Sequence, residues 1–344
     1  MNMKKRIIML VLALLMLTGC SLPRKSGEPI YEATYLNLFD TVTVIKGRAE
    51  SAEAFTEVAQ GIYDELEYYH QLFDIYNDYE ELNNLKTVND MAGVAPVSVD
   101  RAIIDLLTDC RGYYELTGGK VNVAMGSVLR LWHEARNYGL DHPDEAKLPD
   151  MEALKAAAEH LDFDAVIIDE AASTVFISDP EVRLDVGAIA KGWATQRVAE
   201  KAPEGMLLSI GGNVCATGPK TEMGTPWVIG VRNPAGSADS YLHTLNVTEG
   251  SYVTSGDYQR AFEVDGKMYH HIIDPETLMP SDYWRSVTVV CEDSGLADAL
   301  STALFLMNLE EGQALLDICG AAALWVDREG NLYYSPGFEE NIRS

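Results

Sequence analysis

The amino-acid sequence predicts an α+β fold in which helices and antiparallel strands are interspersed. Segments with apolar residues at helical spacing dominate the first half of the chain, whereas short runs rich in β-branched residues dominate the second half. The two kinds of segment do not alternate strictly, and strict alternation is what a parallel sheet with crossover helices requires. We therefore expect antiparallel strand pairs packed against helices.

Four segments show the periodicity of helices. Apolar residues recur at spacings of three and four over residues 52–73, 102–116 and 151–160, with few helix breakers. A further helix is expected over residues 295–309, where the hydroxyl of Ser294 is placed to cap the first turn.

The other predicted elements are short strands. A hairpin is expected within residues 166–177, because two β-branched runs flank an Asp-Glu-Ala-Ala-Ser turn. A second hairpin is expected to join residues 260–264 to 267–271 across Asp265-Gly266, a dipeptide favoured in two-residue turns. Further strands are predicted over residues 207–210, 227–231, 286–291, 324–326 and 332–334.

The N-terminus has the features of a secretory signal. Basic residues at positions 4–6 precede an apolar run over residues 7–17, which is shorter than the about 20 residues of a membrane-spanning helix. The Leu-Thr-Gly-Cys that follows resembles the bacterial lipobox, whose cysteine, here Cys20, becomes the diacylated first residue. An ordinary signal peptide with a chance cysteine is the alternative.

We accordingly expect three regions: a lipoprotein signal peptide, a lipidated cysteine with a flexible tether, and one folded domain, over residues 1–19, 20–34 and 35–340. This predicts an extracytoplasmic protein that is anchored to the cell membrane by lipidated Cys20.

Charge and cysteine usage restrict the partners. The formal net charge of -27 argues against binding to nucleic acid or to anionic lipid headgroups. The four cysteines after Cys20 are widely spaced and lack a CxxC pair, so they indicate neither a zinc site nor a disulfide framework; they are Cys110, Cys215, Cys291 and Cys319. We expect buried thiols; one disulfide is the alternative if the compartment is oxidising.

Residues 184–194 predict a strand that ends in small residues before a helix begins. Small residues let backbone approach a ligand, the helix start supplies free N–H groups, and Lys191 adds a cation. This combination suits a phosphate or a pyrophosphate. A strand-to-helix turn with a solvated lysine is the plainer interpretation.

Asp298 and Thr302 are four residues apart in the last predicted helix, so they project from one face. A carboxylate and a hydroxyl suit Mg²⁺, which prefers oxygen ligands and often keeps substrate phosphates among them. The alternative is a buried helix with Asp298 near its N-terminus and Thr302 bonded back to the helix.

Three further patterns are candidates for a site. The adjacent His270 and His271 precede Asp-Pro on a predicted strand, and a histidine there is a candidate proton acceptor or a structural residue; only one of the two is expected to point into a cleft. Gly211-Gly212 predicts a turn with positive φ that also permits close approach to a flavin or ribose. Trp132 is either an aromatic wall or a core residue.

Taken in order, seven segments resemble the ApbE family, the FAD:protein FMN transferases, and the resemblance runs from about residue 36 to residue 309. The segments are 38–41, 126–132, 184–194, 210–213, 254–258, 271–275 and 297–304. Two positions depart from the family pattern. Asn122 follows Val121 where the family has an Asp after an aromatic residue, and Leu278 replaces a glycine, so that turn is expected to differ in conformation.

The resemblance implies a T-fold-like α+β domain with FAD as substrate in a cleft between two halves. It implies Mg²⁺ ligands at Asp298, Thr302 and the Ala188 carbonyl, and catalytic roles for His271 and Lys191. The residues implied to contact FAD are Asp185, Lys191, Gly211, Gly212, Thr254, Ser255, Gly256, Asp257 and His271.

The implied reaction moves FMN from FAD to a Thr or Ser hydroxyl of a target flavoprotein, which belongs to a membrane or extracellular redox system, and releases AMP. Two alternatives stay open on the residues alone: an FAD pyrophosphatase that uses water as acceptor, and a non-catalytic FAD-binding lipoprotein. A solute-binding lipoprotein for another ligand would need two lobes with parallel strands, which the strand-rich second half disfavours.

Overall fold

The computed structural model describes residues 28–237 and 240–343. The predicted signal peptide, Cys20 and most of the predicted tether lie outside these residues. The tether was predicted too long, because strand β1 already begins at Ile30. Its register with β2 pairs Tyr31, Ala33 and Tyr35 with the neighbouring strand, and these side chains pack against the core. Among the described helices, none is long and apolar enough to cross a membrane.

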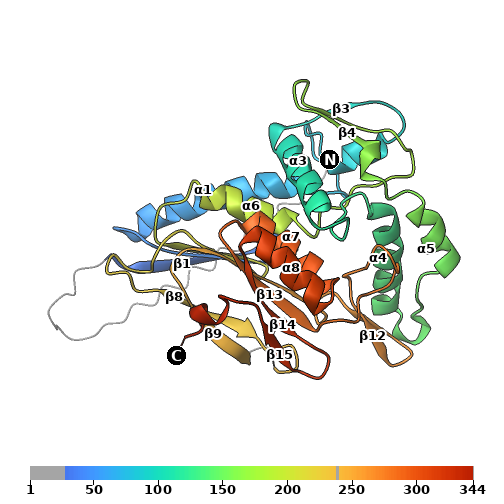
Figure 1. Cartoon of the computed structure of the whole chain (residues 1–344). Helices are drawn as coiled ribbons and strands as arrows, with labels where there is room; N and C mark the ends of the chain where they lie inside the picture. Colours follow the sequence, from blue (N-terminus) through green and yellow to red (C-terminus); the bar gives the residue numbers. More distant parts are fainter. Residues whose placement is uncertain (1–27, 238–239, 344) are drawn as a thin grey trace.

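An antiparallel eight-stranded sheet forms the centre of the fold, in the order β1-β2-β6-β7-β10-β13-β14-β15 (Figure 1). The strands are β1 Ile30–Leu38, β2 Thr41–Arg48, β6 Met206–Ile210, β7 Asn213–Ala216, β10 Gly250–Gly256, β13 Ser286–Cys291, β14 Ala322–Val326 and β15 Leu332–Tyr334. The predicted α+β class is therefore confirmed.

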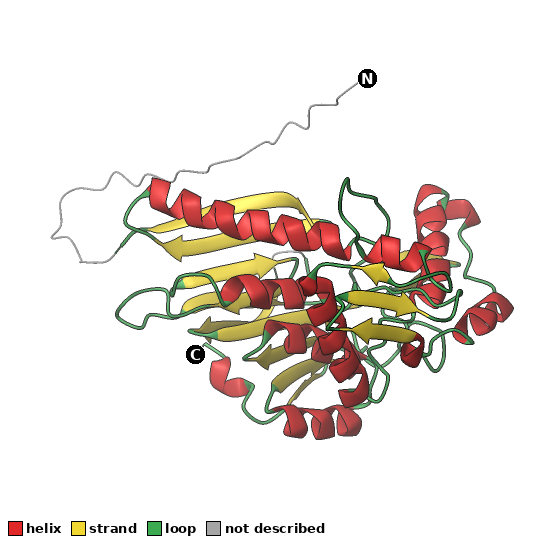
Figure 2. Cartoon of the chain, turned by 90° about the horizontal axis from the view of Figure 1, so that it is seen from above, coloured by secondary structure: helices red, strands yellow, loops and turns green. Residues whose placement is uncertain are grey.

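The two faces of this sheet are covered differently. One face carries helices, which Figure 2 shows lying across the strands: α1 Ala52–Phe73, α6 Ala190–Ala199, α7 Ser294–Phe305 and α8 Leu309–Cys319. The other face is covered by the hairpin of β8 Trp227–Arg232 and β9 Tyr241–Val247, which buries Trp227 and Leu245 against it. Period-2 alternation along the strands supplies apolar side chains to both faces.

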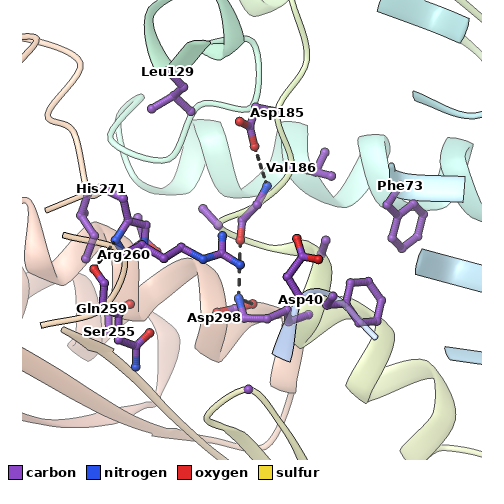
Figure 3. Close-up of a pocket in the computed structure, with 18 of the residues that line it drawn as sticks. Asp40, Phe73, Leu129, Asp185, Val186, Ser255, Gln259, Arg260, His271 and Asp298 are labelled. Atoms are coloured by element: carbon purple, nitrogen blue, oxygen red, sulfur yellow. Dashed lines mark hydrogen bonds and ion pairs between the residues drawn. The ribbon is translucent and has the colours of Figure 1, made fainter. Parts of the chain in front are cut away.

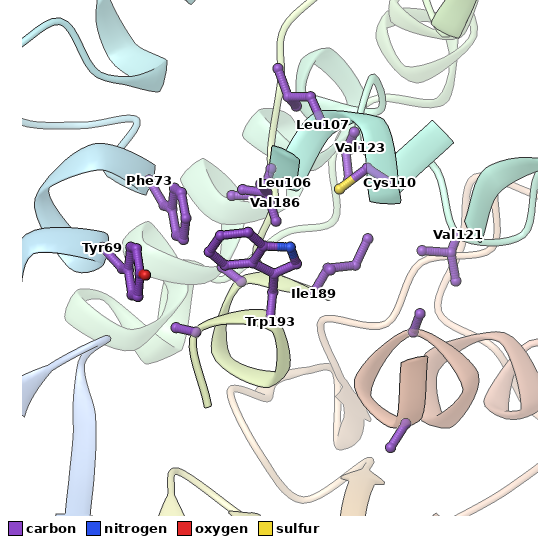
Figure 4. Close-up of a cluster of buried hydrophobic side chains, with 14 of the residues drawn as sticks. Tyr69, Phe73, Leu106, Leu107, Cys110, Val121, Val123, Val186, Ile189 and Trp193 are labelled. Atoms are coloured by element: carbon purple, nitrogen blue, oxygen red, sulfur yellow. The ribbon is translucent and has the colours of Figure 1, made fainter. Parts of the chain in front are cut away.

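Smaller elements form the other side of the domain. They are α2 Leu85–Asp90, α3 Arg101–Leu116, α4 Gly126–Asp141, α5 Met151–Ala158, the sheet of β3 Val97–Ser98, β5 Thr174–Ile177 and β4 Val166–Asp169, the hairpin of β11 Phe262–Val264 and β12 Lys267–Tyr269, and 3-10 turns at Pro143–Glu145, Phe163–Ala165 and Glu339–Asn341. Trp193 of α6 joins this side to the main sheet: its indole N–H donates to Asp109 of α3 at 2.8 Å, and its ring packs edge-on against Tyr69 and Phe73 of α1 (Figure 4).

Several element boundaries differ from the predicted ones. The last predicted helix, residues 295–309, was too long, because α7 ends at Phe305. A separate helix that was not predicted, α8, begins at Leu309, where Asn308 caps it through a capping box with Glu311. Asp293, and not Ser294, caps α7: its carboxylate accepts from the backbone N–H of Leu296 at 2.7 Å. A carboxylate at this position also complements the helix dipole.

Trp132 is a core residue. It is 3% exposed, and its indole N–H donates to the carbonyl of Leu278 at 3.0 Å. The interpretation of Trp132 as an aromatic wall is therefore wrong, because its neighbours Leu129 and His133 on α4 line the pocket and Trp132 faces away from it.

Candidate functional site

A pocket lies where the central sheet meets the smaller α/β side of the domain (Figure 3). Its walls come from the β1–β2 turn, the loop after α1, the start of α4, the loop into α6, the end of β10, and α7. The predicted site residues that line it are Asp185, Ala188, Lys191, Gly211, Thr254, Ser255, Gly256, His271, Asp298 and Thr302. Segments separated by more than 100 positions in the sequence thus meet in one cavity.

The loop before α6 is extended but is not a strand. The backbone N–H of Asp185 donates to the carbonyl of Val123 at 2.8 Å, which ties the loop to the residues before α4 and not to a sheet. The Asp185 carboxylate accepts from the N–H of Gly187 at 2.9 Å and so turns the chain into α6. Lys191 lies in the first turn, with its ammonium 3.6 Å from the Asp298 carboxylate.

Asp298 connects α7 to α6. It is 4% exposed, and its Oδ2 accepts from the backbone N–H of Gly192 at 2.8 Å. Its Oδ1 accepts no hydrogen bond from any residue in the described ranges and is not fully buried. A free carboxylate oxygen in a pocket that Thr302 and Ala188 also line fits a hard cation that prefers oxygen ligands.

No group of three or more His, Cys, Asp or Glu side chains that could hold a metal occurs among the described residues. A cation at Asp298 would therefore need the hydroxyl of Thr302, the carbonyl of Ala188, and oxygens from substrate or water to complete its ligands. Mg²⁺ commonly binds in this way, with one or two carboxylates and substrate phosphates.

Gly192 lets α6 and α7 approach closely enough for these contacts. A Cβ at this position would lie 2.3 Å from the Ser294 carbonyl oxygen and 2.4 Å from the Asp298 Cβ. We expect Gly192→Ala to lower stability by about 1–3 kcal/mol, as overpacked cores do, and to displace the Asp298 carboxylate. Thermal melting and Mg²⁺ titration measure the two effects.

The control for this substitution is Gly61→Ala in α1, where nothing lies within 4 Å of the added Cβ. Alanine is there expected to raise stability by about 0.5–1 kcal/mol through helix propensity alone. If Gly192→Ala also stabilised the protein and left Mg²⁺ binding unchanged, the close α6–α7 contact would not support the site.

His271 is held as a neutral base. Its Nδ1 donates to the backbone carbonyl of Gln259 at 3.1 Å, which leaves Nε2 as the acceptor nitrogen. Burial, followed by the nearby charges of Arg260, His270 and Lys191, lowers the pKa of His271 to about 3. The ring is therefore unprotonated at neutral pH, and its Nε2 has a lone pair that can accept a hydrogen bond from a hydroxyl in the pocket.

The neighbouring His270 is structural. It is 4% exposed, its Nε2 donates to the Ser281 carbonyl at 2.8 Å, and its Nδ1 accepts from the N–H of Ile272 at 3.2 Å. Both ring nitrogens are satisfied, and the pKa is lowered mainly by burial. The expectation that only one of the two histidines faces the cleft is confirmed.

The end of β10 contributes hydroxyl groups to the pocket. Thr254 shares a hydrogen bond with Thr288 at 2.9 Å, and Ser255 shares one with Ser301 at 2.8 Å. Asp257 does not line the pocket, contrary to the prediction. Its carboxylate instead lies 3.5 Å from Arg285 and 3.3 Å from Arg328, because these arginines are the nearest compensating charges.

Gly211 and Gly212 form the β6–β7 turn, with φ of 58° and 99°. Positive φ was expected here and is confirmed. Of the two glycines, only Gly211 lines the pocket. It lies against Thr41 of β2, and a Cβ added to it would be 2.6 Å from the Thr41 side chain. Gly212 does not line the pocket, so its predicted contact with FAD is not part of this pocket.

The two departures from the family pattern are accommodated. Leu278 keeps a left-handed backbone with φ of 60°, so the expectation of a different turn conformation is wrong. Its N–H donates to the Asp274 carbonyl at 2.8 Å and its side chain is 7% exposed, so tertiary contacts hold the strained turn. Asn122 lines the pocket while its amide donates to the Leu161 carbonyl at 2.8 Å.

Several lining residues were not predicted from the sequence. Phe39 and Asp40 form the β1–β2 turn with φ of 50° and 54°, the type I′ pattern, which points Asp40 into the pocket (Figure 3). Tyr76 and His133 share a hydrogen bond of 2.9 Å at the rim. Lys120 and Arg260 are further lining residues without a predicted role. Of these six residues, only Phe39 and Asp40 lie in one of the segments that carry the family resemblance.

The described cysteines are free thiols. Cys110 and Cys215 are buried, whereas Cys291 and Cys319 are half-buried. Burial is the main cause that raises the pKa of each thiol, so none has the lowered pKa of a reactive cysteine.

Comparison with known proteins agrees with this geometry. The profile of the ApbE family matches residues 38–325. The chain belongs to the ApbE family. An ApbE relative from Treponema pallidum (strain Nichols), named FAD:protein FMN transferase, is 35% identical over 277 residues, which cover 75% of each chain. A relative of the same name from Vibrio cholerae is 28% identical and covers 89% of this chain and 88% of its own.

Solved ApbE structures share the fold. The crystal structure of an ApbE protein from Thermotoga maritima superposes with a TM-score of 0.81 at 30% identity, covering 92% of this chain and 100% of that one. The flavin transferase ApbE from Vibrio cholerae gives a TM-score of 0.75 at 25% identity, covering 91% and 100%. The predicted family and its α+β architecture are thereby confirmed.

Proposed function

We propose that the chain transfers FMN from FAD to a Thr or Ser hydroxyl of a target flavoprotein through a phosphoester bond, with release of AMP and dependence on Mg²⁺. The observation that supports this most is that one pocket is lined by the neutral base His271, the cation Lys191 and the carboxylate Asp298, which can bind a metal cation. The names of the family relatives support FAD as the FMN donor and a protein as the acceptor.

The chemistry assigned to each residue follows from its position. Nε2 of His271 accepts the proton of the acceptor hydroxyl as its oxygen attacks the FMN phosphorus. The new P–O bond forms on the FMN phosphate while the bond to the AMP phosphate breaks, so AMP takes the electron pair. The Lys191 ammonium stabilises charge that gathers on the pyrophosphate oxygens, and the pocket walls fix the in-line geometry.

Mg²⁺ held by Asp298, Thr302 and the Ala188 carbonyl would add Lewis-acid stabilisation of the same oxygens. Lys191 helps to orient the Asp298 carboxylate, since its ammonium lies 3.6 Å from Oδ2. The contact to the Gly192 N–H holds Oδ2 in place, so that Oδ1 faces the ligand side.

Labelling of a protein acceptor with FMN distinguishes this function from an FAD pyrophosphatase and from an FAD-binding lipoprotein. We would incubate the chain lacking residues 1–20 with FAD, Mg²⁺ and a flavoprotein fragment that carries a Thr acceptor motif, and measure intact mass. We expect the mass of the fragment to increase by one FMN when Mg²⁺ is present and to stay unchanged when EDTA is added. AMP release without labelling of the fragment would identify an FAD pyrophosphatase, and bound FAD without AMP release would identify an FAD-binding lipoprotein.

We also propose that the enzyme acts outside the cytoplasm, anchored to the membrane through lipidated Cys20, on a flavoprotein of a membrane or extracellular redox system. The support is the signal-like sequence of residues 1–19 and the lipobox-like sequence before Cys20. Cys20→Ala is expected to move the protein from the membrane fraction to the soluble extracytoplasmic fraction. Unchanged membrane association would contradict lipid anchoring at this cysteine.

A further inference from the structure

Arg260 lies in the loop between β10 and β11 and lines the pocket with no assigned role. Its backbone is left-handed, with φ of 46°, which costs free energy for a residue other than glycine. Figure 3 shows its side chain extending from the His271 side into the pocket. Such strain is typical of positions where the fold presents a functional side chain.

The same turn orients the base. The carbonyl of Gln259 accepts the hydrogen bond from Nδ1 of His271 at 3.1 Å, and the next residue along the chain is Arg260. One loop therefore fixes both the proton acceptor and a guanidinium beside it. Consistently, the charge of Arg260 is the largest influence after burial in lowering the pKa of His271.

The Arg260 side chain has no ion-pair or hydrogen-bond partner among residues 28–237 and 240–343. Lys120 lies 3.3 Å from Asp274 and 2.9 Å from Glu276, and Lys191 lies 3.6 Å from Asp298. Of the cations that line the pocket among the described residues, Arg260 alone makes no ion pair or side-chain hydrogen bond with a described residue.

The surroundings of Arg260 add positive charge. The charge of Arg260 lowers the pKa of Arg136 and of His133, and both effects show that these groups lie close together. Two carboxylates act at this end, Asp185 on His133 and Tyr76 and Asp74 on Tyr76. Both already accept hydrogen bonds: Oδ1 of Asp185 from the Gly187 N–H, and Oδ1 of Asp74 from the Tyr76 N–H. An unpaired guanidinium in this setting favours a phosphate, whose oxygens match its planar fork.

We propose that Arg260 binds the FMN phosphate of FAD, with its guanidinium on the non-bridging oxygens of the phosphorus that is attacked. This proposal rests on the function proposed above, because the acceptor hydroxyl that reaches His271 must also reach this phosphorus. Arg260 then holds the transferred group from the side of the base, while Lys191 and Asp298 act from the opposite side. The same contact stabilises the charge on these oxygens while the bond to the acceptor oxygen forms and the bond to AMP breaks.

A comparison of riboflavin with FMN and FAD tests whether Arg260 contacts the phosphate, because riboflavin has the same ring system but no phosphate. We would measure competition of riboflavin and of FMN against bound FAD, with and without Mg²⁺. Arg260→Gln is expected to weaken FMN and FAD binding by about tenfold or more, the size of a lost hydrogen bond to a charged group, and to leave riboflavin binding unchanged. Arg260→Lys, which keeps the charge and loses the fork, is expected to be intermediate.

The matched control is Arg136→Gln. Arg136 is half-buried, acts on the same neighbouring groups and does not line the pocket; among the described residues its guanidinium hydrogen-bonds only to Asn137. Wild-type affinity for FMN in this variant is expected, since a direct contact and not the general positive potential binds the phosphate. Melting curves exclude unfolding of either variant.

Two results would overturn the proposal: wild-type FMN affinity in Arg260→Gln, or an equal loss of riboflavin and FMN affinity. Failure of the proposed function is a separate outcome. If the wild-type chain labelled no acceptor, the transferase function would be wrong. If the wild-type chain labelled the acceptor and Arg260→Gln bound FMN normally, only the role of Arg260 would be wrong.

Discussion

Asp298→Asn is expected to reduce FMN transfer by about a hundredfold or more, because several kcal/mol of transition-state stabilisation depend on the metal that its carboxylate holds. Asparagine keeps the shape of the side chain, and its carbonyl can still accept from the Gly192 N–H, which in the wild type lies 2.8 Å from Oδ2. The α6–α7 contact is therefore retained while the charge is lost. Transfer rates measured against Mg²⁺ concentration, with calorimetric titration of Mg²⁺, test this expectation.

Asp293→Asn is the matched control for this substitution. Asp293 lies one residue before α7, five positions before Asp298, and caps the helix by accepting from the Leu296 N–H. Asparagine is an equally good N-cap residue, so we expect little change in stability and none in Mg²⁺ dependence. A wild-type Mg²⁺ response in Asp298→Asn would show that the metal, if required, binds elsewhere.

Local patterns predicted the parts of this structure that depend on neighbours in sequence. Helix α1 was predicted at its observed bounds, because its apolar positions repeat over many turns between polar flanks. The spacing of Asp298 and Thr302 placed both on one face of α7, and both line the pocket. The β4–β5 hairpin was predicted for the same reason, since its two strands pair across a short turn.

Other features depend on contacts between distant segments, so the sequence alone did not indicate them. The start of β1 was assigned to the tether, because residues 21–31 contain Pro, Gly and basic residues and lack apolar periodicity; pairing with β2 makes this segment a strand. Asp257 has the position of a ligand contact in the family pattern, but it does not line the pocket, and Arg285 and Arg328 both lie against its Oδ2. Arg260 carries no sequence motif, and only the fold brings it beside His271.

His271→Ala is expected to lower the rate of FMN transfer by about 10²–10⁴-fold, the usual contribution of a general base. FAD binding is expected to persist, since Lys191 and Asp298 remain in the pocket. Single-turnover labelling of the acceptor fragment at saturating FAD separates the chemical step from binding. A labelling rate in His271→Ala equal to that of the wild type would exclude this histidine as the base.

The pH dependence offers an independent check on the same residue. In the free enzyme the pKa of His271 is lowered to about 3, so the ring is neutral above that pH and loses its acceptor nitrogen only as pH falls through it. The kcat/KM for FAD reports groups of the free enzyme, so it should show no acid limb near the ordinary histidine pKa of about 6.5. A limb at that pH that disappears in His271→Ala would contradict the burial and the flanking charges inferred for this base.

His270→Gln distinguishes a loss of the base from a loss of local structure. His270 uses both ring nitrogens to hold the loop at Ser281 and Ile272, so its replacement is expected to lower the melting temperature. Below that temperature the folded fraction should still transfer FMN, because this ring faces the core and does not line the pocket. Equal rate losses in the two histidine variants would mean that His271 acts by shaping the loop and not by accepting the proton.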